Sequence, residues 1–418
     1  MDQFIIDGGR RLYGNVKLQS AKNSVLPLFA AAILTEKQVT ILDTPPISDV
    51  LCMAQILREL GCEVRFKGSS VTVDSANADC HEIPPTLTKE LRSSVFMLGS
   101  LLTRFHRAKI AYPGGCDIGL RPIDLHLTAL KRLGVTIQER EGYILCECEK
   151  LTGAEIALDF PSVGATENIL LAAVMAEGET VLSGAAREPE IVDLQNFLNA
   201  MGAKIAGAGT DVIRVSGVKK LGGVIYRPMK DRIEAGTFLI AGAICGGEVE
   251  VTGIKSENIG MLLHKLRENG CKIHTKNDKI RLESAGRLKC NRRIETLPFP
   301  GFPTDLQAQM TALNSVCEGG TLVTENLFET RFKYVPELKK MGADIEVKGR
   351  NALVRGVPAL HGAAVTAGDL RGGAALVLAA LKAEGVSEVY DLTHIDRGYA
   401  YFLEKLKGLG AKIRRVRV

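Results

Sequence analysis

A glycine that recurs six times at nearly constant spacing is the sequence feature that most limits how this chain can fold. Each copy follows the end of an amphipathic helical pattern and precedes a strand pattern, as in LRELGCEVRF and LKKMGADIEV. The six are Gly61, Gly134, Gly202, Gly270, Gly342 and Gly410, with gaps of 73, 68, 68, 72 and 68 residues. Glycine after a helix suits the left-handed conformation that commonly ends helices. The 418 residues therefore predict six copies of one α/β repeat.

Each repeat contains a strand, a helix rich in small residues, a strand, an amphipathic helix and a hairpin such as CEVRFKGSSVTVDS. The sixth hairpin stops short at AKIRRVRV, and the N-terminal FIIDGGRRLYGNVKL is similar to the part that is missing. We therefore predict two α/β domains of three repeats each, residues 22–229 and residues 1–21 with 230–418. A cleft between two such domains is a natural place for a ligand.

Composition excludes several classes of function. Hydrophobic residues make up 46% and charged residues 24%, as in ordinary globular proteins. With no tryptophan, 5% aromatic residues and a net charge of only +5, the chain is a poor binder of nucleic acid. The N-terminus lacks the pattern of a signal peptide and no apolar run approaches 18 residues, so we expect a cytoplasmic protein with no membrane partner. The ten cysteines and seven histidines show no metal-ligand spacing, and we expect no metal and no cofactor.

Polar residues stand where the first helix of each repeat is expected to begin. They are Lys22, Arg92, Thr166 with Glu167, Arg232, Asp305 and Arg371. Helix N-termini carry unpaired N–H groups and the positive end of the helix dipole, so four cations there indicate an anion-binding protein. The alternative is that Asp305 and Thr166 are helix N-caps and that the arginines are solvated.

A second set of residues lies in the later loop of the repeats. In YPGGCDIGLRPIDLH, Cys116 follows two glycines and precedes Arg121 by five residues. An exposed thiol beside a cation is favoured as a thiolate or a proton donor. The alternative is a turn that contains an incidental cysteine. Arg331 and Arg397 occupy corresponding places in FETRFKY and HIDRGYAYF, so the arginines could converge on one cleft.

Taken together, these segments closely resemble the enolpyruvyl transferase family, in the branch that acts on UDP-N-acetylglucosamine. The resemblance covers essentially the whole chain. It rests on Lys22-Asn23, the PGGC loop with RPIDLH, SVGATEN, REPEIVDL, DRIEAGT, GFPTDLQAQ, ETRFKYVPEL, DLRGGAALVLAAL and HIDRGY. It implies two inside-out α/β barrel domains, each of three repeats, with an active-site cleft between them. Two residues depart from the family pattern: Ser20 stands where glycine is usual, and Leu120 where small residues are common.

The resemblance also implies a reaction and the residues that perform it. The enolpyruvyl group of phosphoenolpyruvate passes to the 3-hydroxyl of UDP-N-acetylglucosamine through a tetrahedral ketal, with release of phosphate, in the first committed step of peptidoglycan synthesis. Cys116 matches the general acid that fosfomycin alkylates, and Asp305 matches the base. Lys22, Arg121 and Arg397 match the cations that hold phosphoenolpyruvate, with Arg92 and Arg371 nearby. The UDP-sugar contacts match Asn23, Arg121, Pro122, Ile123, Asp124, Leu125, Ser162, Val163, Gly164, Thr304, Asp305 and Leu327.

Three other interpretations predict different residues. A 5-enolpyruvylshikimate-3-phosphate synthase typically has Lys-Ser after its first strand and no PGGC loop, whereas this chain has Lys22-Asn23 and Cys116. A non-catalytic paralogue is expected to lose Asp305, Cys116 or the arginines, and all are present. A purely structural repeat protein normally varies less at its helix starts. The sequence does not indicate an oligomeric state.

Overall fold

The computed structural model describes residues 2–112 and 123–417, which form two compact units. Unit 1 contains the chain up to Gln19 and from Lys230 onward, and unit 2 contains the described residues from Ser20 to Met229. Unit 1 therefore combines the N-terminal segment with the C-terminal half of the chain. Each unit is described below by itself.

Unit 1 has three four-stranded sheets within its described residues. The first sheet has the strand order β21 (Ala364–Thr366), β22 (Val386–Tyr390), β1 (Asp2–Asp7), β23 (Lys412–Arg417). The second has the order β15 (Lys272–Lys276), β16 (Lys279–Ser284), β14 (Gly247–Thr252), β2 (Leu12–Lys17). The third has the order β17 (Arg293–Glu295), β18 (Gly320–Thr324), β20 (Asn351–Arg355), β19 (Asp344–Lys348). In each sheet one neighbouring pair is parallel and the others are antiparallel, which repeats the same topology three times.

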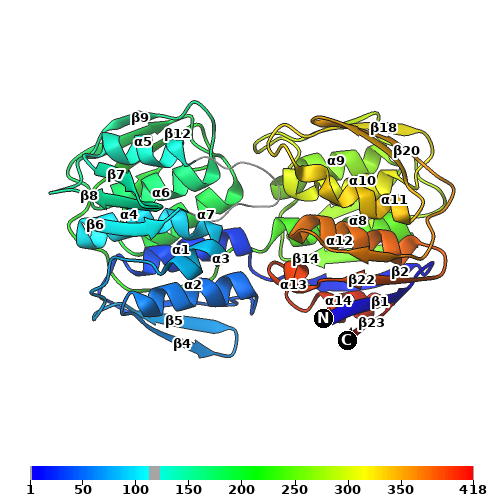
Figure 1. Cartoon of the computed structure of the whole chain (residues 1–418), viewed down its shortest axis with the longest axis horizontal. Helices are drawn as coiled ribbons and strands as arrows, with labels where there is room; N and C mark the ends of the chain where they lie inside the picture. Colours follow the sequence, from blue (N-terminus) through cyan, green and yellow to red (C-terminus); the bar gives the residue numbers. More distant parts are fainter. Residues whose placement is uncertain (1, 113–122, 418) are drawn as a thin grey trace. The chain divides into compact units, whose positions relative to one another are not determined.

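The N-terminal strand β1 takes the place of the second strand of the sixth hairpin. It pairs with β23 in antiparallel register from Asp2 opposite Arg417 to Asp7 opposite Lys412. The next strand, β2, pairs in parallel with β14 and so completes a different sheet. Both chain ends therefore lie in unit 1, close together in Figure 1.

Unit 2 repeats this plan with shorter strands. Its described residues form the sheets β11 (Lys204–Ala206), β12 (Val212–Ser216), β10 (Glu179–Ser183), β9 (Glu155–Ala157); β13 (Val224–Tyr226), β3 (Val39–Ile41), β5 (Ser70–Asp74), β4 (Glu63–Lys67); and the three-stranded β6 (Arg107–Ala111), β8 (Tyr143–Glu147), β7 (Thr136–Arg140). The sheets lie around the helices of their own unit (Figure 1).

Three helices of each unit are almost entirely buried. In unit 1 they are α8 (Arg232–Cys245), α10 (Gln307–Asn314) and α12 (Leu370–Lys382), and in unit 2 they are α1 (Lys22–Ala32), α4 (Met97–Phe105) and α6 (Val163–Ala173). Every residue of α8 and α10 is buried. Small residues such as Ala and Gly in these helices allow the close packing of neighbouring elements, as in α12, where eleven of thirteen residues are buried. These helices form the centre of each unit, and α8 and α10 also bury polar side chains such as Thr237 and Gln309 there.

The second helix of each repeat packs one face on its sheet and ends at the recurring glycine. These helices are α2 (Ser48–Glu59), α5 (Asp124–Arg132), α7 (Pro189–Ala200), α9 (Gly260–Glu268), α11 (Val335–Lys340) and α14 (Phe402–Gly408). The six glycines have φ between 91° and 104°, a region that a side chain at Cβ disfavours. Shorter helical segments are α3 (Pro85–Glu90), α13 (Thr393–Asp396) and the 3₁₀ turns η1 (Arg92–Phe96), η2 (Ser256–Ile259), η3 (Thr304–Leu306) and η4 (Arg331–Tyr334). None of the helices in the described residues is long and apolar enough to cross a membrane.

Candidate active site

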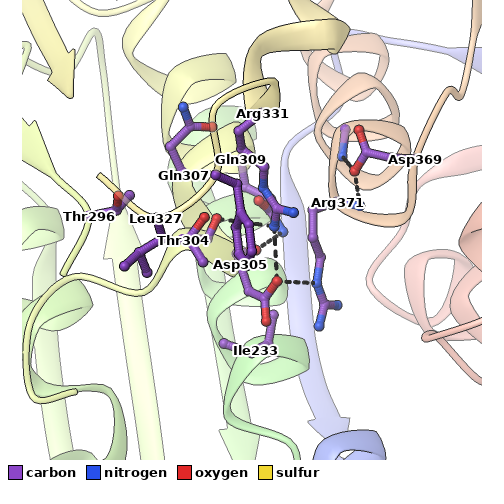
Figure 2. Close-up of polar contacts among 12 residues, drawn as sticks. Ile233, Thr296, Thr304, Asp305, Gln307, Gln309, Leu327, Arg331, Asp369 and Arg371 are labelled. Atoms are coloured by element: carbon purple, nitrogen blue, oxygen red, sulfur yellow. Dashed lines mark hydrogen bonds and ion pairs between the residues drawn. The ribbon is translucent and has the colours of Figure 1, made fainter. Parts of the chain in front are cut away.

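In unit 1, a carboxylate is held between two buried arginines. Arg331 Nη2 donates to Asp305 Oδ1 at 2.9 Å, and Arg371 Nε lies 3.4 Å from the same oxygen. The side chains of Arg331 and Arg371 are 3% and 5% exposed, whereas that of Asp305 is 29% exposed. Figure 2 shows the two guanidinium groups approaching Asp305 from different elements. The arginines are thus fixed in the protein, and the carboxylate between them is accessible.

Local structure explains why these side chains meet. Asp305 is the second residue of η3, directly before the buried helix α10, and Arg331 begins η4. Arg371 lies in the first turn of α12, where Asp369 accepts hydrogen bonds from the N–H groups of Arg371 and Gly372 at 2.9 and 3.0 Å. Asp305 and Arg371 therefore both lie where a buried helix of unit 1 begins.

A residue that the sequence analysis missed organises the loop beside Asp305. Glu325 is fully buried and accepts hydrogen bonds from Thr304 Oγ1 at 2.9 Å and from the N–H groups of Leu327 and Phe328 at 2.8 and 3.1 Å. It also accepts from Thr296 Oγ1 at 2.8 Å. Glu325 therefore holds Thr304 and Leu327, two of the expected UDP-sugar contacts, in one arrangement. The only signal in the sequence was an acidic residue directly after a strand.

The alternative interpretation of Asp305 and Thr166 as helix caps is wrong. The side chain of Asp305 pairs with the arginines, and η3 has no side-chain cap. Thr166 lies inside the first turns of α6, where its hydroxyl accepts from the N–H of Ala186 at 3.0 Å. The capping residues are instead Ser162, Asp231 and Asp369, which accept backbone N–H groups at the starts of α6, α8 and α12. The alternative that the helix-start arginines are solvated is wrong for Arg232 and Arg371, which are both buried.

In unit 2, the cation at the start of a buried helix is paired with an acid. Lys22 is the first residue of α1, and its Nζ lies 3.0 Å from Asp49 Oδ2 on α2. The two side chains are 15% and 6% exposed. Lys22 and Asn23 are also the only residues of α1 that are not buried. The Lys22-Asn23 motif therefore marks the accessible end of an otherwise enclosed helix.

A second residue missed at the sequence level, His126, links two of the expected UDP-sugar segments. It lies on α5, and its Nδ1 is 3.1 Å from Asn168 Nδ2 on α6. A Cβ added at Gly164 would lie 3.1 Å from the His126 ring, so glycine in SVGATEN allows the close approach. Burial, together with the charge of Arg92, lowers the pKa of His126 to about 4. The imidazole is therefore neutral near pH 7, and its Nδ1 accepts the amide proton.

Glu167, next to Thr166 on α6, is also buried. Burial raises its pKa well above the usual value, with a further contribution from the charges of Glu190 and Glu188. The start of α6 therefore favours a protonated carboxyl group, in contrast to the arginine-bound carboxylate of unit 1.

The remaining expected residues fall at the starts of elements or outside the described part of the chain. Arg92 begins η1, Arg397 follows α13, and Asp124 and Leu125 begin α5 after Ile123. Ser162, Val163 and Gly164 form the start of α6. Cys116, Arg121 and Pro122 lie outside the described residues.

No group of three or more His, Cys, Asp or Glu side chains within the described residues is arranged to hold a metal ion. The cysteines that the structure describes are free thiols. In unit 1 the geometry is that of a polar site for anions, built from guanidinium and carboxylate groups.

Comparison with known proteins agrees with this chemistry. Residues 6–406 match the family model described as EPSP synthase (3-phosphoshikimate 1-carboxyvinyltransferase). The chain is 52% identical over 416 residues to UDP-N-acetylglucosamine 1-carboxyvinyltransferase 2 of Caldanaerobacter subterraneus subsp. tengcongensis, with all of both chains covered. It is 49% identical to UDP-N-acetylglucosamine 1-carboxyvinyltransferase 1 of Symbiobacterium thermophilum, covering 99% of this chain and 95% of the relative.

Solved structures show the same fold. The enolpyruvyl transferase NikO from Streptomyces tendae superposes with a TM-score of 0.89 at 26% identity, covering 100% of this chain and 99% of the other. An EPSP synthase from Acinetobacter baumannii superposes with a TM-score of 0.77 at 18% identity, with both chains fully covered, and supports the fold alone. The repeated α/β fold and the family match identify an enolpyruvyl transferase. Within that class, the chain belongs to the UDP-N-acetylglucosamine 1-carboxyvinyltransferase family.

Proposed function

We propose that this enzyme transfers the enolpyruvyl group of phosphoenolpyruvate to the 3-hydroxyl of UDP-N-acetylglucosamine and releases phosphate, which starts peptidoglycan synthesis. The observation that carries the proposal is Asp305 held between Arg331 and Arg371 in a chain 52% identical to an enzyme named for this reaction. The proposal includes two inside-out α/β barrel domains, supported by buried helices within sheets in each unit, and a cytoplasmic location, where both substrates are metabolites.

The substrates together carry a carboxylate and three phosphates, so binding them requires fixed cations. Arginine donates in a planar fork that matches carboxylate and phosphate oxygens. Among the described residues, Arg331 Nε and Arg371 Nη1 are buried nitrogens without a hydrogen-bond partner. Buried donors normally have partners, and an anionic substrate supplies them. Lys22, Arg92, Arg121 and Arg397 complete the set that we assign to substrate binding.

The reaction needs one proton delivered and one removed. Protonation of C3 of phosphoenolpyruvate makes C2 electrophilic, and the sugar 3-hydroxyl oxygen attacks C2 as its proton leaves. We assign the delivery to the Cys116 thiol and the removal to Asp305, each worth about 10²–10⁴-fold. The resulting tetrahedral ketal then loses phosphate from C2 and a proton from C3, which regenerates the carbon–carbon double bond. The fixed guanidinium groups stabilise the phosphate as it departs.

The remaining assigned residues hold the UDP-sugar. Asn23, Ile123, Asp124 and Leu125 with the start of α6 carry this role in unit 2, and Thr304 with Leu327 carries it in unit 1. The contacts of Glu325 with Thr304 and Leu327 support this assignment, because they fix both residues beside Asp305.

Phosphate release tests the function directly. The enzyme is expected to release phosphate from phosphoenolpyruvate when UDP-N-acetylglucosamine is the acceptor and not when shikimate-3-phosphate is. Mass spectrometry of the nucleotide product then checks that one enolpyruvyl group has been added for each phosphate released. Phosphate release with shikimate-3-phosphate alone would contradict the proposal, and so would release without any enolpyruvyl product.

A further inference from the structure

A buried polar cluster lies behind the arginine-bound carboxylate of unit 1. Its members are Thr237 on α8, Gln309 on α10 and Tyr399, which follows α13. They are 0%, 0% and 3% exposed. Burying a hydroxyl or an amide is costly unless its hydrogen bonds are made, and an apolar side chain would fill each place without that cost. The contacts of the cluster indicate what these polar groups do.

The donor and the acceptor of these hydrogen bonds follow from the single proton of the Thr237 hydroxyl. The Thr237 hydroxyl donates to the Ile233 carbonyl at 2.8 Å, which uses its single proton. Thr237 Oγ1 therefore accepts from the Tyr399 hydroxyl at 2.9 Å and from Gln309 Nε2 at 3.3 Å. Gln309 Nε2 also donates to the backbone carbonyl of Asp305 at 3.0 Å. Burial raises the pKa of Tyr399, which keeps its hydroxyl protonated as the donor.

The cluster reaches Asp305 from a second direction through Arg371. The central guanidinium carbon of Arg371 lies 5.4 Å from the centre of the Tyr399 ring, and Arg371 Nε lies 3.4 Å from Asp305 Oδ1. Gln309 holds the backbone of Asp305, and Tyr399 supports the arginine that holds its carboxylate. Figure 2 shows Gln309 and Arg371 on different elements around Asp305.

The same tyrosine belongs to the segment that carries Arg397. Tyr399 follows Arg397 by two residues, and the Gln19 carboxamide bonds to both sides of it. Gln19 Nε2 donates to the Gly398 carbonyl at 2.9 Å, and the Ala400 N–H donates to Gln19 Oε1 at 2.8 Å. Tyr399 is therefore fixed at its backbone by Gln19 and at its hydroxyl by Thr237.

We propose that Thr237, Gln309 and Tyr399 are positioning residues that hold Asp305, Arg371 and the Arg397 segment of unit 1 in a single catalytic arrangement. The inference rests on the proposed function, in which Asp305 takes the proton from the sugar hydroxyl. All three residues are buried, so each acts through Asp305, Arg371 or the Arg397 segment. They act because a proton-transfer group displaced by a fraction of an ångström loses much of its effect, while substrate binding depends on many other contacts.

Substitutions at Thr237 test this role with a matched pair. Thr237→Val keeps the shape and removes the acceptor, and we expect kcat to fall about 10- to 100-fold with the KM for UDP-N-acetylglucosamine changed less than about twofold. Thr237→Ser keeps the hydroxyl, and we expect kcat within about threefold of the unmodified enzyme. Tyr399→Phe removes the hydroxyl and keeps the ring against Arg371, and we expect a loss similar to that of Thr237→Val.

Thr321→Val is the control for a purely structural role. Thr321 is also fully buried in unit 1, and its hydroxyl donates to Asn314 Oδ1 at 2.9 Å, away from the cluster. We expect it to lower the Tm about as much as Thr237→Val and to leave kcat unchanged. If Thr237→Val and Tyr399→Phe lower Tm like the control but retain kcat, the inference is overturned. If the unmodified enzyme forms no enolpyruvyl product, the proposed function itself has failed.

Discussion

Units 1 and 2 contain the same threefold repeat of buried helix and sheet, but they treat charge at the helix starts in different ways. In unit 1 the acid Asp305 contacts two cations, Arg331 and Arg371. In unit 2 the cation Lys22 contacts the acid Asp49, and the buried Glu167 at the start of α6 has a raised pKa. The repeat therefore provides equivalent positions, and the residue at each position decides the local charge. This is the general relation between a fold and the sites built on it.

We assign the two proton transfers of the reaction to two different residues, Asp305 and Cys116. Unit 1 supplies the carboxylate of Asp305, which buried guanidinium groups fix in position and which we assign to the acceptance of a proton. Cys116 lies between β6 and α5 in the sequence, and we assign it to the donation of a proton. A reaction that adds an alcohol across a vinyl phosphate needs both groups.

Removing the acid of unit 1 is expected to have the largest effect. Asp305→Ala should lower kcat by about 10²–10⁴-fold, because the sugar hydroxyl then loses its proton acceptor. Binding of UDP-N-acetylglucosamine, measured by calorimetry, should remain, since the other contacts are unchanged. Near-normal turnover in this variant would show that Asp305 is not the proton acceptor that we assign to unit 1.

Cys116 provides the corresponding experiment in unit 2. Cys116→Ala should lower kcat by at least about 10²-fold and abolish inactivation by fosfomycin. Cys116→Asp should retain activity and resist fosfomycin, because a carboxylic acid can donate a proton but is a poor nucleophile toward the epoxide. Turnover rates and the mass of the treated protein measure both effects. A Cys116→Ala enzyme with normal rate and normal sensitivity would contradict the assignment.

Local sequence patterns predicted the repeated elements and the helix starts, because both depend on neighbouring residues. A glycine after a helix and a cation at the next helix start can be recognised within one repeat. The contacts that build the site could not be predicted in the same way. Asp305 meets Arg371 across 66 residues, and His126 meets Asn168 across 42. Such contacts depend on the packing of separate repeats.

The helix N-caps were predicted wrongly for a different reason. Asp231 and Asp369 directly precede buried helices, which is the position that N-cap preference favours. The local rule is sufficient for these two residues, whereas Asp305 and Thr166 lie within the helical turns and do not cap them. Glu325 was missed because a buried acid surrounded by N–H and hydroxyl donors has no distinctive local pattern.

The smallest effect is expected in the pH dependence of stability. It comes from two buried groups, His126 and Glu234, whose pKa values shift in opposite directions. In unit 2, burial and the charge of Arg92 lower the pKa of His126 from 6.5 to about 4. In unit 1, burial raises the pKa of Glu234 from 4.5 to about 7, although Lys405 Nζ lies 2.5 Å from its carboxylate. His126 therefore binds its proton more weakly in the folded protein than in the unfolded chain, and Glu234 binds its proton more tightly.

The two groups should give opposite pH dependences of stability. His126 costs the folded protein stability as pH falls from about 6.5 to about 4, and Glu234 costs it stability as pH rises from about 4.5 to about 7. We therefore expect the Tm of the unmodified protein minus that of His126→Asn to decrease toward acid pH. The Tm of the unmodified protein minus that of Glu234→Gln should decrease toward neutral pH. Calorimetric scans between these limits measure both slopes, and subtraction removes the groups that the proteins share. Slopes of the same sign would show that one of the two buried groups does not titrate as its surroundings require.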